Sequence, residues 1–206
     1  MRAADAAGPG PTGEFPVTLA VDGLVLRRSD PADAGEVAEA VNGSLAHLAP
    51  WMGWARRPAR LEETAVRLAL AGAAFDAGGH AEWTVLRSEE GPVVGACGLY
   101  QVPDGGCRQI GYWVRAGFTK QGIASASAAA MAWTAFARMG LERVEIRCDV
   151  ANVRSAGVAR RLGFTLVGTV AGDALTAGTT GRCEVWALAR DDWPTSPAAG
   201  WAVGRR

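Results

Sequence analysis

The amino-acid sequence predicts a single α+β domain in which helices flank a mixed, mostly antiparallel central sheet. In the middle of the chain, three strand-like runs separated by turn residues are typical of an antiparallel meander. The last of these runs leads into a glycine loop and an alanine-rich helix, and strands then alternate with helices. A chain of 206 residues is long enough to bury one substantial core.

The N-terminal part of the domain is predicted to hold one strand and two helices. Residues 24–28 indicate the strand, and residues 29–31 (Ser-Asp-Pro) then offer a capping residue and a proline for a helix through about Asn42. A second helix is expected after Pro58, because apolar residues recur there near helical spacing. These residues are Leu61, Ala65, Leu68 and Leu70.

The meander is followed by two more helices and three more strands. The turns 89–92 and 103–106 separate the meander strands 81–87, 93–100 and 108–114. A helix over 125–139 is expected to end at Gly140, and another over about 153–162 to stop at Gly163. The strands predicted in this half are 144–148, 164–168 and 184–189.

Both ends of the chain are predicted to be flexible tails around one domain. Residues 1–16 are rich in Gly, Pro and Ala and hold Asp5 and Glu14, so they match neither a signal peptide nor a membrane-spanning helix. The tail 194–206 is rich in Pro and Gly as well. We therefore expect a domain over 17–193 and a cytoplasmic protein.

The composition argues against several classes of partner. Lys+Arg and Asp+Glu both total 21, so no overall field favours nucleic acid or an anionic membrane. The four cysteines include no C-x-x-C pair, and the two histidines lack metal-ligand spacing. We expect reduced, mostly buried thiols and no metal.

The strand, loop and helix over 110–139 have the form of a phosphate site. The loop Thr119–Ala124 contains the only lysine in the chain, Lys120, and a glycine before the helix. Free backbone N–H groups and the helix dipole bind phosphate at such a point. Taken alone, the loop fits an ordinary strand–helix turn equally well. The P-loop and dinucleotide patterns are absent.

A second motif identifies the family that the chain resembles. Asn152-Val153-Arg154-Ser155 leads into Leu162-Gly163-Phe164, and with the loop it is similar to the GCN5-related N-acetyltransferases (GNAT) of the RimJ/RimL type. The resemblance covers roughly residues 22–193 and includes the runs 48–52, 111–114 and 184–188. It implies a GNAT-type domain whose parallel strand pair splays apart. It also implies a β-bulge in the strand at 112–114.

Two residues depart from the usual loop of this branch. Thr119 replaces a Gln or Arg, which removes one long polar side chain, and Lys120 stands where glycine is usual. We expect altered affinity for the cofactor rather than lost binding.

The resemblance implies acetyl-CoA as co-substrate. Its pantetheine arm would lie in the slot between the splayed strands, and a backbone N–H near Trp113 or Val114 would polarise the thioester carbonyl. The Trp113 side chain fits a core aromatic equally well. The residues expected to bind the cofactor are Tyr112, Trp113, Val114, Thr119, Lys120, Gln121, Gly122, Ile123, Ala124 and Asn152.

The resemblance also assigns catalytic roles. Ser155 would give a proton to the departing sulfur, and Glu184 would act as the base, with Glu145 and Glu82 as competitors. Ser155 and Asn152 fit ordinary first-turn and N-cap roles as well. The residues Trp51, Met52 and Trp54 would line the acceptor pocket, or else form a lid or a dimer contact.

The predicted function is acetyl transfer from acetyl-CoA to a primary amine by direct attack. The acceptor is a small-molecule amine or a protein N-terminal amine, and the zero net charge favours the small amine slightly. A non-catalytic acyl-CoA-binding module is the alternative. The identity of the acceptor, the size of the acyl group and a homodimer are left open by the sequence.

Overall fold

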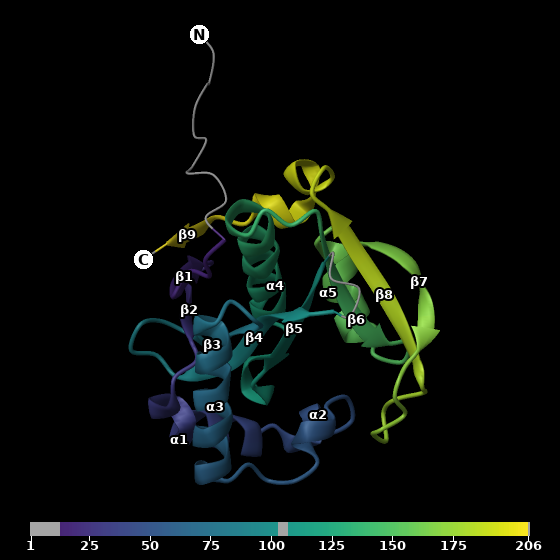
Figure 1. Cartoon of the computed structure of the whole chain (residues 1–206). Coiled ribbons are helices and arrows are strands. Elements are labelled where there is room, and N and C mark those ends of the chain that lie inside the picture. Colours follow the sequence, from purple (N-terminus) through teal and green to yellow (C-terminus); the bar gives the residue numbers. More distant parts are fainter. Residues whose placement is uncertain (1–12, 103–106, 206) are drawn as a thin grey trace.

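The computed structural model describes residues 13–102 and 107–205. In them a nine-stranded sheet runs through the molecule, with helices on both of its faces (Figure 1). The strand order is β7-β8-β6-β5-β4-β3-β2-β1-β9. Neighbouring strands are antiparallel except for β5 and β6, which run parallel. The predicted mixed, mostly antiparallel sheet is confirmed.

The elements occur in an order close to the predicted one. The strands are β1 (Thr18–Val21), β2 (Leu24–Arg28), β3 (Ala81–Leu86), β4 (Val93–Gln101), β5 (Arg108–Val114), β6 (Arg143–Asp149), β7 (Thr165–Ala171), β8 (Arg182–Ala189) and β9 (Val203–Arg205). The α-helices are α1 (Ala34–Asn42), α2 (Leu45–Leu48), α3 (Leu61–Asp76), α4 (Ile123–Trp133) and α5 (Val153–Arg161). The predicted meander turn at 103–106 lies outside the described residues.

Two cores form on opposite faces of the sheet because strand side chains alternate in direction. In β2, Leu24 and Leu26 belong to the core under α4 and α5, whereas Val25 belongs to the core under α1, α2 and part of α3. The three-layer arrangement leaves the ends of β5 and β6 between the two helical layers.

The parallel pair β5–β6 separates along its length. The two strands are paired only at their beginnings, where Arg108 lies opposite Val144 and Gln109 opposite Glu145. The remainder of β5 stays paired with β4 through Val114. The strands therefore leave a V-shaped slot toward their C-terminal ends, as the resemblance implies.

The bulge that the resemblance implies at 112–114 is not found. The described residues of β4 and β5 keep one register from Gln101–Arg108 to Gly95–Val114, without a shift. The slot opens instead because β6 turns toward β8, with which it pairs along its whole length.

Two helices differ from their predicted form. The helix predicted over 125–139 begins at Ile123, and its last turn is a π-helix over Thr134–Arg138. In α3, Leu61 and Leu70 are exposed. The buried residues of this helix are Thr64, Leu68, Ala71, Gly72 and Phe75, which follow the helical period that the predicted set did not.

The ends of the described chain are ordered parts of the fold, and the predicted tails need correction there. Phe15 is buried against Phe75 and Trp83. The predicted tail 194–206 includes β9, which pairs with β1 at the edge of the sheet (Figure 1). Residues 18–21, for which no strand was predicted, form β1 between β2 and β9.

Candidate functional site

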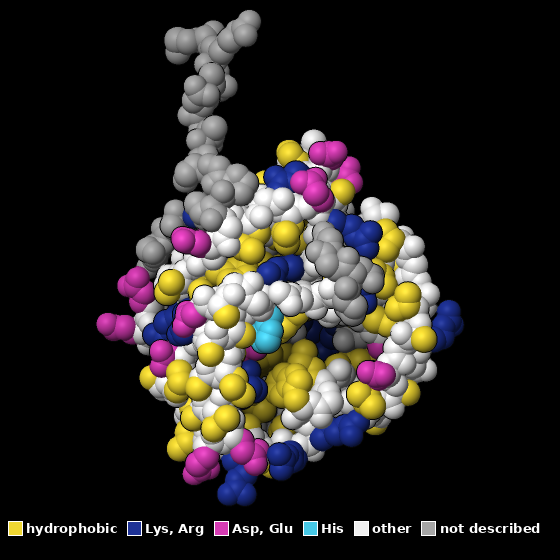
Figure 2. All heavy atoms as spheres, viewed as in Figure 1, with side chains coloured by type: hydrophobic (Ala, Val, Ile, Leu, Met, Phe, Trp, Pro, Cys, Tyr) yellow, Lys and Arg dark blue, Asp and Glu magenta, His cyan; other side chains and the backbone are white. Residues whose placement is uncertain are grey.

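One large cleft, with a volume of about 1000 Å³, passes through the sheet where β5 and β6 separate. Cys148 and Ser155 line it on the α5 side, and His47 and Trp51 line it on the α2 side. The space-filling view shows a hollow beside α2 in which hydrophobic side chains gather, with basic side chains near its edge (Figure 2). The cleft thus connects the two faces of the sheet.

The loop before α4 turns through two residues with positive φ. Lys120 and Gly122 both have left-handed backbone conformations, with φ of 63° and 80°, and Gly122 is the N-cap of α4. Such turns aim successive N–H groups at one point, and the helix dipole adds positive potential there. A Cβ built on Gly122 would meet no atom within 4 Å, so an anion can approach this backbone closely.

The side chains of the loop contribute unequally to the cleft. Thr119, Lys120, Gly122, Ile123 and Ala124 line it. The Thr119 hydroxyl donates to the carbonyl oxygen of Ala116 at 3.1 Å, so it serves the loop itself. Gln121 is exposed, lies outside the cleft lining and donates to Gly117.

Two contacts tie the approach to this loop to α1 and the start of α2. The buried Ser44 hydroxyl donates to the carbonyl oxygen of Ala40 at 2.6 Å and accepts from the N–H of Ala116 at 2.9 Å. Arg115 and Glu39 form an ion pair at 2.8 Å. These contacts connect the segment before the loop directly to α1 and to the residue before α2.

The free edge of β5 directs backbone donors into the slot. The N–H of Arg115 donates to the carbonyl oxygen of Val94 on β4. Because N–H groups alternate in direction along a strand, those of Tyr112 and Val114 point toward β6. Beyond Gln109 β6 has moved away, so these N–H groups face the cleft. Tyr112, Trp113 and Val114 all line it.

Ser155 sits where β5, β6 and α5 meet. Asn152 is the N-cap of α5 and accepts from the Ser155 N–H at 3.2 Å, and both residues line the cleft. The Ser155 hydroxyl lies 2.9 Å from the Tyr112 hydroxyl. Asn152 therefore combines the capping role with a place in the site, and the Ser155 side chain bonds another side chain as well.

Burial keeps the protic neighbours of Ser155 neutral. Burial raises the pKa of the Cys148 thiol to about 11, against a smaller opposing effect of its hydrogen bond with Ser155. Burial also raises the pKa of Tyr112 above its usual range, again against the hydrogen bond with Ser155. Since the thiolate is the reactive form of cysteine, this raised pKa argues against Cys148 as a nucleophile.

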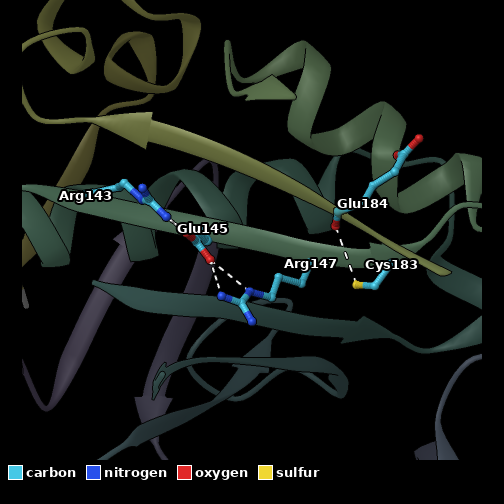
Figure 3. Close-up of polar contacts among 5 residues, drawn as sticks. All are labelled: Arg143, Glu145, Arg147, Cys183 and Glu184. Carbon is cyan, nitrogen blue, oxygen red and sulfur yellow. Dashed lines mark hydrogen bonds and ion pairs between the residues drawn. The ribbon is translucent and has the colours of Figure 1, made fainter. Parts of the chain in front are cut away.

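Glu184, the predicted base, does not line the cleft. In β8 it shares a face with Trp186, whose indole N–H donates to its carboxylate at 2.9 Å and whose ring lies under Arg160 of α5. Glu184 points to the opposite side of the sheet from Glu145, Arg147 and Cys183 (Figure 3). In the β6–β8 register Glu184 is paired with Cys148, which lines the cleft. Glu184 is therefore next to the cleft wall but is not part of it.

The two competing carboxylates are engaged elsewhere. Glu145 is fully buried and pairs with both Arg143 and Arg147, the latter at 2.8 Å (Figure 3). Glu82 pairs with Arg67 at 2.7 Å and accepts from the Tyr100 hydroxyl. Neither carboxylate lines the cleft, so neither is placed to take a proton from a bound amine.

The predicted acceptor residues are only partly brought together. Trp51 and Met52 line the cleft on the α2 side, next to His47 and Leu48. Trp54 does not line it: its side chain is exposed and stands edge-on to Trp113, with ring centroids 6.2 Å apart.

A loop from the far edge of the sheet completes this wall. It spans 172–181 between β7 and β8 and will be called the 172–181 loop. The Pro50 carbonyl oxygen accepts from the Thr176 hydroxyl at 2.5 Å and from the Gly178 N–H at 3.1 Å. At its other end, Asp149 accepts from the Thr180 N–H at 2.7 Å. The loop thus joins β6 to the α2 side.

The sequence analysis gave no site role to six ionisable residues that line the cleft: His47, Arg147, Asp149, Arg154, Arg161 and Asp173. His47 was considered only as a metal ligand, although it directly precedes the singled-out run 48–52. Burial, and then the charge of Arg154, lowers its pKa below the usual value. Asp173 lies in the 172–181 loop, whose sequence carries no pattern that could have found it.

The described residues also bear on three negative predictions. No group of three or more His, Cys, Asp or Glu side chains among them could hold a metal ion. All four cysteines are free thiols, and Cys97 and Cys148 are buried. Across residues 13–102 and 107–205, no helix has the length and apolar character needed to cross a membrane.

Comparison with known proteins identifies the domain. The sequence model of the family described as acetyltransferase (GNAT) domain matches residues 23–165. No curated protein sequence matches the chain.

Solved structures of acetyltransferases share the fold over most of their length. Mycobacterium smegmatis RimJ in complex with CoA-disulfide is 25% identical, with a TM-score of 0.76 over 88% of this chain and 90% of that one. RimL, a ribosomal L7/L12 alpha-N-protein acetyltransferase in complex with coenzyme A, is 24% identical (TM-score 0.74; 84% and 99% covered). The microcin C7 self-immunity acetyltransferase MccE, in complex with acetyl-CoA and AMP, is 19% identical (TM-score 0.72; 82% and 93% covered).

Proposed function

The chain belongs to the GNAT acetyltransferase family, and we propose that its cleft performs acetyl transfer to an amine with Ser155 as the proton donor. It is an acetyltransferase that uses acetyl-CoA as co-substrate. One observation carries the residue assignment. A single cleft joins an anion-binding turn, Ser155 at the parting of β5 and β6, and an apolar wall on the other face.

The turn at Lys120–Gly122 would hold the pyrophosphate of acetyl-CoA. Its N–H groups and the α4 dipole suit that group, and the space at Gly122 allows its approach. Among the described residues, Lys120, Arg154 and Arg161 line the cleft and take part in no salt bridge, so their charges remain available for phosphates. Asn152 would meet the pantetheine arm in the slot.

The proposed reaction uses three groups: the Val114 N–H, the attacking amine and the Ser155 hydroxyl. The Val114 N–H would polarise the thioester carbonyl oxygen. As the amine nitrogen bonds to the acyl carbon and the C–S bond breaks, the Ser155 hydroxyl would protonate the departing sulfur. The attacking nitrogen gives up one proton and the sulfur gains one, so the transfer needs no outside oxidant or reductant.

Two carboxylates compete for the role of base. Glu184 remains our prediction, acting through a water because its carboxylate lies beyond the cleft wall next to Cys148. Asp173 lines the cleft directly. Comparing Glu184→Gln with Asp173→Asn decides between them: the base variant should lower kcat most at low pH, where the amine carries its extra proton. Equal, small effects would exclude both.

The acceptor is an amine that enters from the α2 side. An α-amino group, with a pKa of about 7.7–8.0, is partly neutral at pH 7, whereas a lysine amine, at about 10.4, is not. A small amine or an extended protein N-terminus fits a wall closed by the 172–181 loop at Pro50. RimL acts on a ribosomal protein and MccE confers self-immunity to microcin C7, so both acceptor classes stay in the proposal.

A thiol-release assay tests the function. The wild-type chain and acetyl-CoA would be screened against small amines and peptides with free N-termini. We expect Ser155→Ala to lower kcat about 100-fold, in line with general acid catalysis, with unchanged coenzyme A affinity. Ser196→Ala removes a half-buried hydroxyl outside the cleft and serves as the control. Unchanged turnover in Ser155→Ala would refute the assignment. Binding without thiol release from any amine would favour the binding module.

Location and assembly also remain predictions. We propose a cytoplasmic enzyme, consistent with an acetyl-CoA-dependent reaction, and leave a homodimer as the form to test. Cell fractionation and light scattering of the purified chain are the measurements.

A further inference from the structure

The Tyr112 hydroxyl is hydrogen-bonded to the Ser155 hydroxyl in the cleft, and the acetyl-transfer scheme above does not use the Tyr112 side chain. Its hydroxyl lies 2.9 Å from the Ser155 hydroxyl oxygen and, in a longer hydrogen bond, 3.4 Å from the Ser155 carbonyl oxygen. The shorter of the two, to the Ser155 hydroxyl, has the distance of a well-formed hydrogen bond between hydroxyl groups.

We propose that Tyr112 is a positioning residue for the reaction: its O–H donates to the Ser155 oxygen, so that the single Ser155 proton points at the departing sulfur. The inference rests on the proposed role of Ser155. A serine hydroxyl has one proton and two acceptor lone pairs. If Ser155 donated to Tyr112, that proton would be turned away from the sulfur.

The direction of the bond follows from the environment. Tyr112 is half-buried, and burial raises the pKa of its phenol above the usual range, so the phenol keeps its proton at neutral pH. A phenol is also a better donor than an alkyl hydroxyl, since it is the stronger acid. The Cys148 thiol, which also forms a hydrogen bond with Ser155, has a pKa raised by burial to about 11 and likewise stays protonated at neutral pH.

The backbone holds the two partners in place independently. Tyr112 is fixed in β5 by its pairing with Cys97 of β4, and Ser155 is fixed in the first turn of α5 by the Asn152 cap. Removing the phenol oxygen should therefore leave both chains where they are and free only the Ser155 rotamer.

The chain supplies a matched control, because it contains two tyrosines. Tyr100, on the neighbouring strand β4, is also poorly accessible and also loses one side-chain hydrogen bond on substitution, the one to Glu82 at 3.2 Å. It does not line the cleft. Tyr112→Phe and Tyr100→Phe thus remove the same atom inside and outside the site.

A double-substitution cycle tests the proposal. We expect Tyr112→Phe to lower kcat about tenfold, with little change in the KM for acetyl-CoA or in coenzyme A affinity, the scale of one oriented hydrogen bond. Tyr100→Phe should keep the wild-type kcat. In a Ser155→Ala background, Tyr112→Phe should have no further effect, because Tyr112 acts only through Ser155.

The outcomes separate the two proposals. If Tyr112→Phe lowers kcat by the same factor with and without Ser155, the positioning role is wrong while the role of Ser155 stands. A wild-type kcat in Tyr112→Phe would also overturn it. If Ser155→Ala alone leaves kcat unchanged, the proposed function fails first. A loss of coenzyme A affinity in Tyr112→Phe would make Tyr112 a binding residue instead.

Discussion

The two halves of the cleft are built in different ways. The half proposed to bind acetyl-CoA, here called the donor half, is built from contiguous segments. The turn at Lys120–Gly122 caps α4, and Asn152 caps the helix that carries Ser155. The acceptor half is assembled from segments far apart in sequence, since Pro50 meets Thr176 and Gly178 of the 172–181 loop. Local backbone geometry thus defines the proposed acetyl-CoA site, while tertiary contacts define the proposed site of the amine acceptor. Substitutions should affect the two halves separately.

The largest effect is expected from Gly122→Val. Valine would have to adopt φ of 80° and would place its side chain where Gly122 leaves open space. Losing one or two charge-assisted N–H contacts at about 1.5–3 kcal/mol each would weaken coenzyme A binding by about 10- to 100-fold or more. Titration calorimetry measures this loss. Gly117→Ala is the control, since its Cβ also meets open space but without positive φ. Wild-type affinity in Gly122→Val would separate the turn from the donor site.

Gly178→Ala should have a smaller effect, and it should affect binding of the amine rather than binding of coenzyme A. A Cβ at this position would overlap the Pro50 carbonyl oxygen, so the 172–181 loop must move from the α2 side. We expect the KM for the amine to rise several-fold while coenzyme A affinity stays unchanged, as steady-state kinetics and calorimetry would report. Gly168→Ala on β7 meets no atom and should be neutral. A matching loss of coenzyme A affinity would show that the halves are not independent.

The sequence predicted the donor half better than the acceptor half, because local patterns define the first and tertiary contacts define the second. The loop 119–124 and the motif Asn152–Ser155 are local patterns with defined backbone roles, and their residues line the cleft, except for Gln121 and Val153. Asp173 and the contact between Pro50 and Thr176 depend on pairing across about half the chain, which periodicity does not report. Strands β1 and β9 were missed likewise, because each is short and is stabilised by its partner.

Lys120 offers a finer test, because it occupies a left-handed position where glycine is usual in the branch. Lys120→Gly should relieve about 1–2 kcal/mol of backbone strain in the folded chain. It should also cost about 0.5–1 kcal/mol of stability, because glycine loses more backbone entropy on folding. The net stabilisation of about 0–1.5 kcal/mol would raise Tm by up to about 3–6 °C. Coenzyme A affinity should fall only a few-fold, the scale of one exposed charge pair. Thermal unfolding and calorimetry measure the two effects, and a large loss of affinity would contradict a site based on backbone N–H groups.

The smallest effect concerns pH. The pKa of His47 is lowered in the folded chain, mainly by burial, so the unfolded chain binds more protons as pH falls through 6.5 and below. This residue therefore costs stability at acid pH and none well above pH 6.5. His47→Gln should make the drop in Tm between pH 7.5 and 5.5 smaller by a degree or two, on the order expected for a fraction of 1 kcal/mol. His80→Gln is the comparison. An unchanged drop would refute a lowered pKa of His47 in the folded chain.

The central claim is that the donor half ends at Ser155 and that the acceptor half begins there. A crystal structure of the chain with coenzyme A tests it most directly. We expect the pyrophosphate on the N–H groups of the Lys120–Gly122 turn and the sulfur within hydrogen-bonding distance of the Ser155 hydroxyl. A sulfur that lies away from the β5–β6 slot, or a pyrophosphate bound elsewhere, would contradict it.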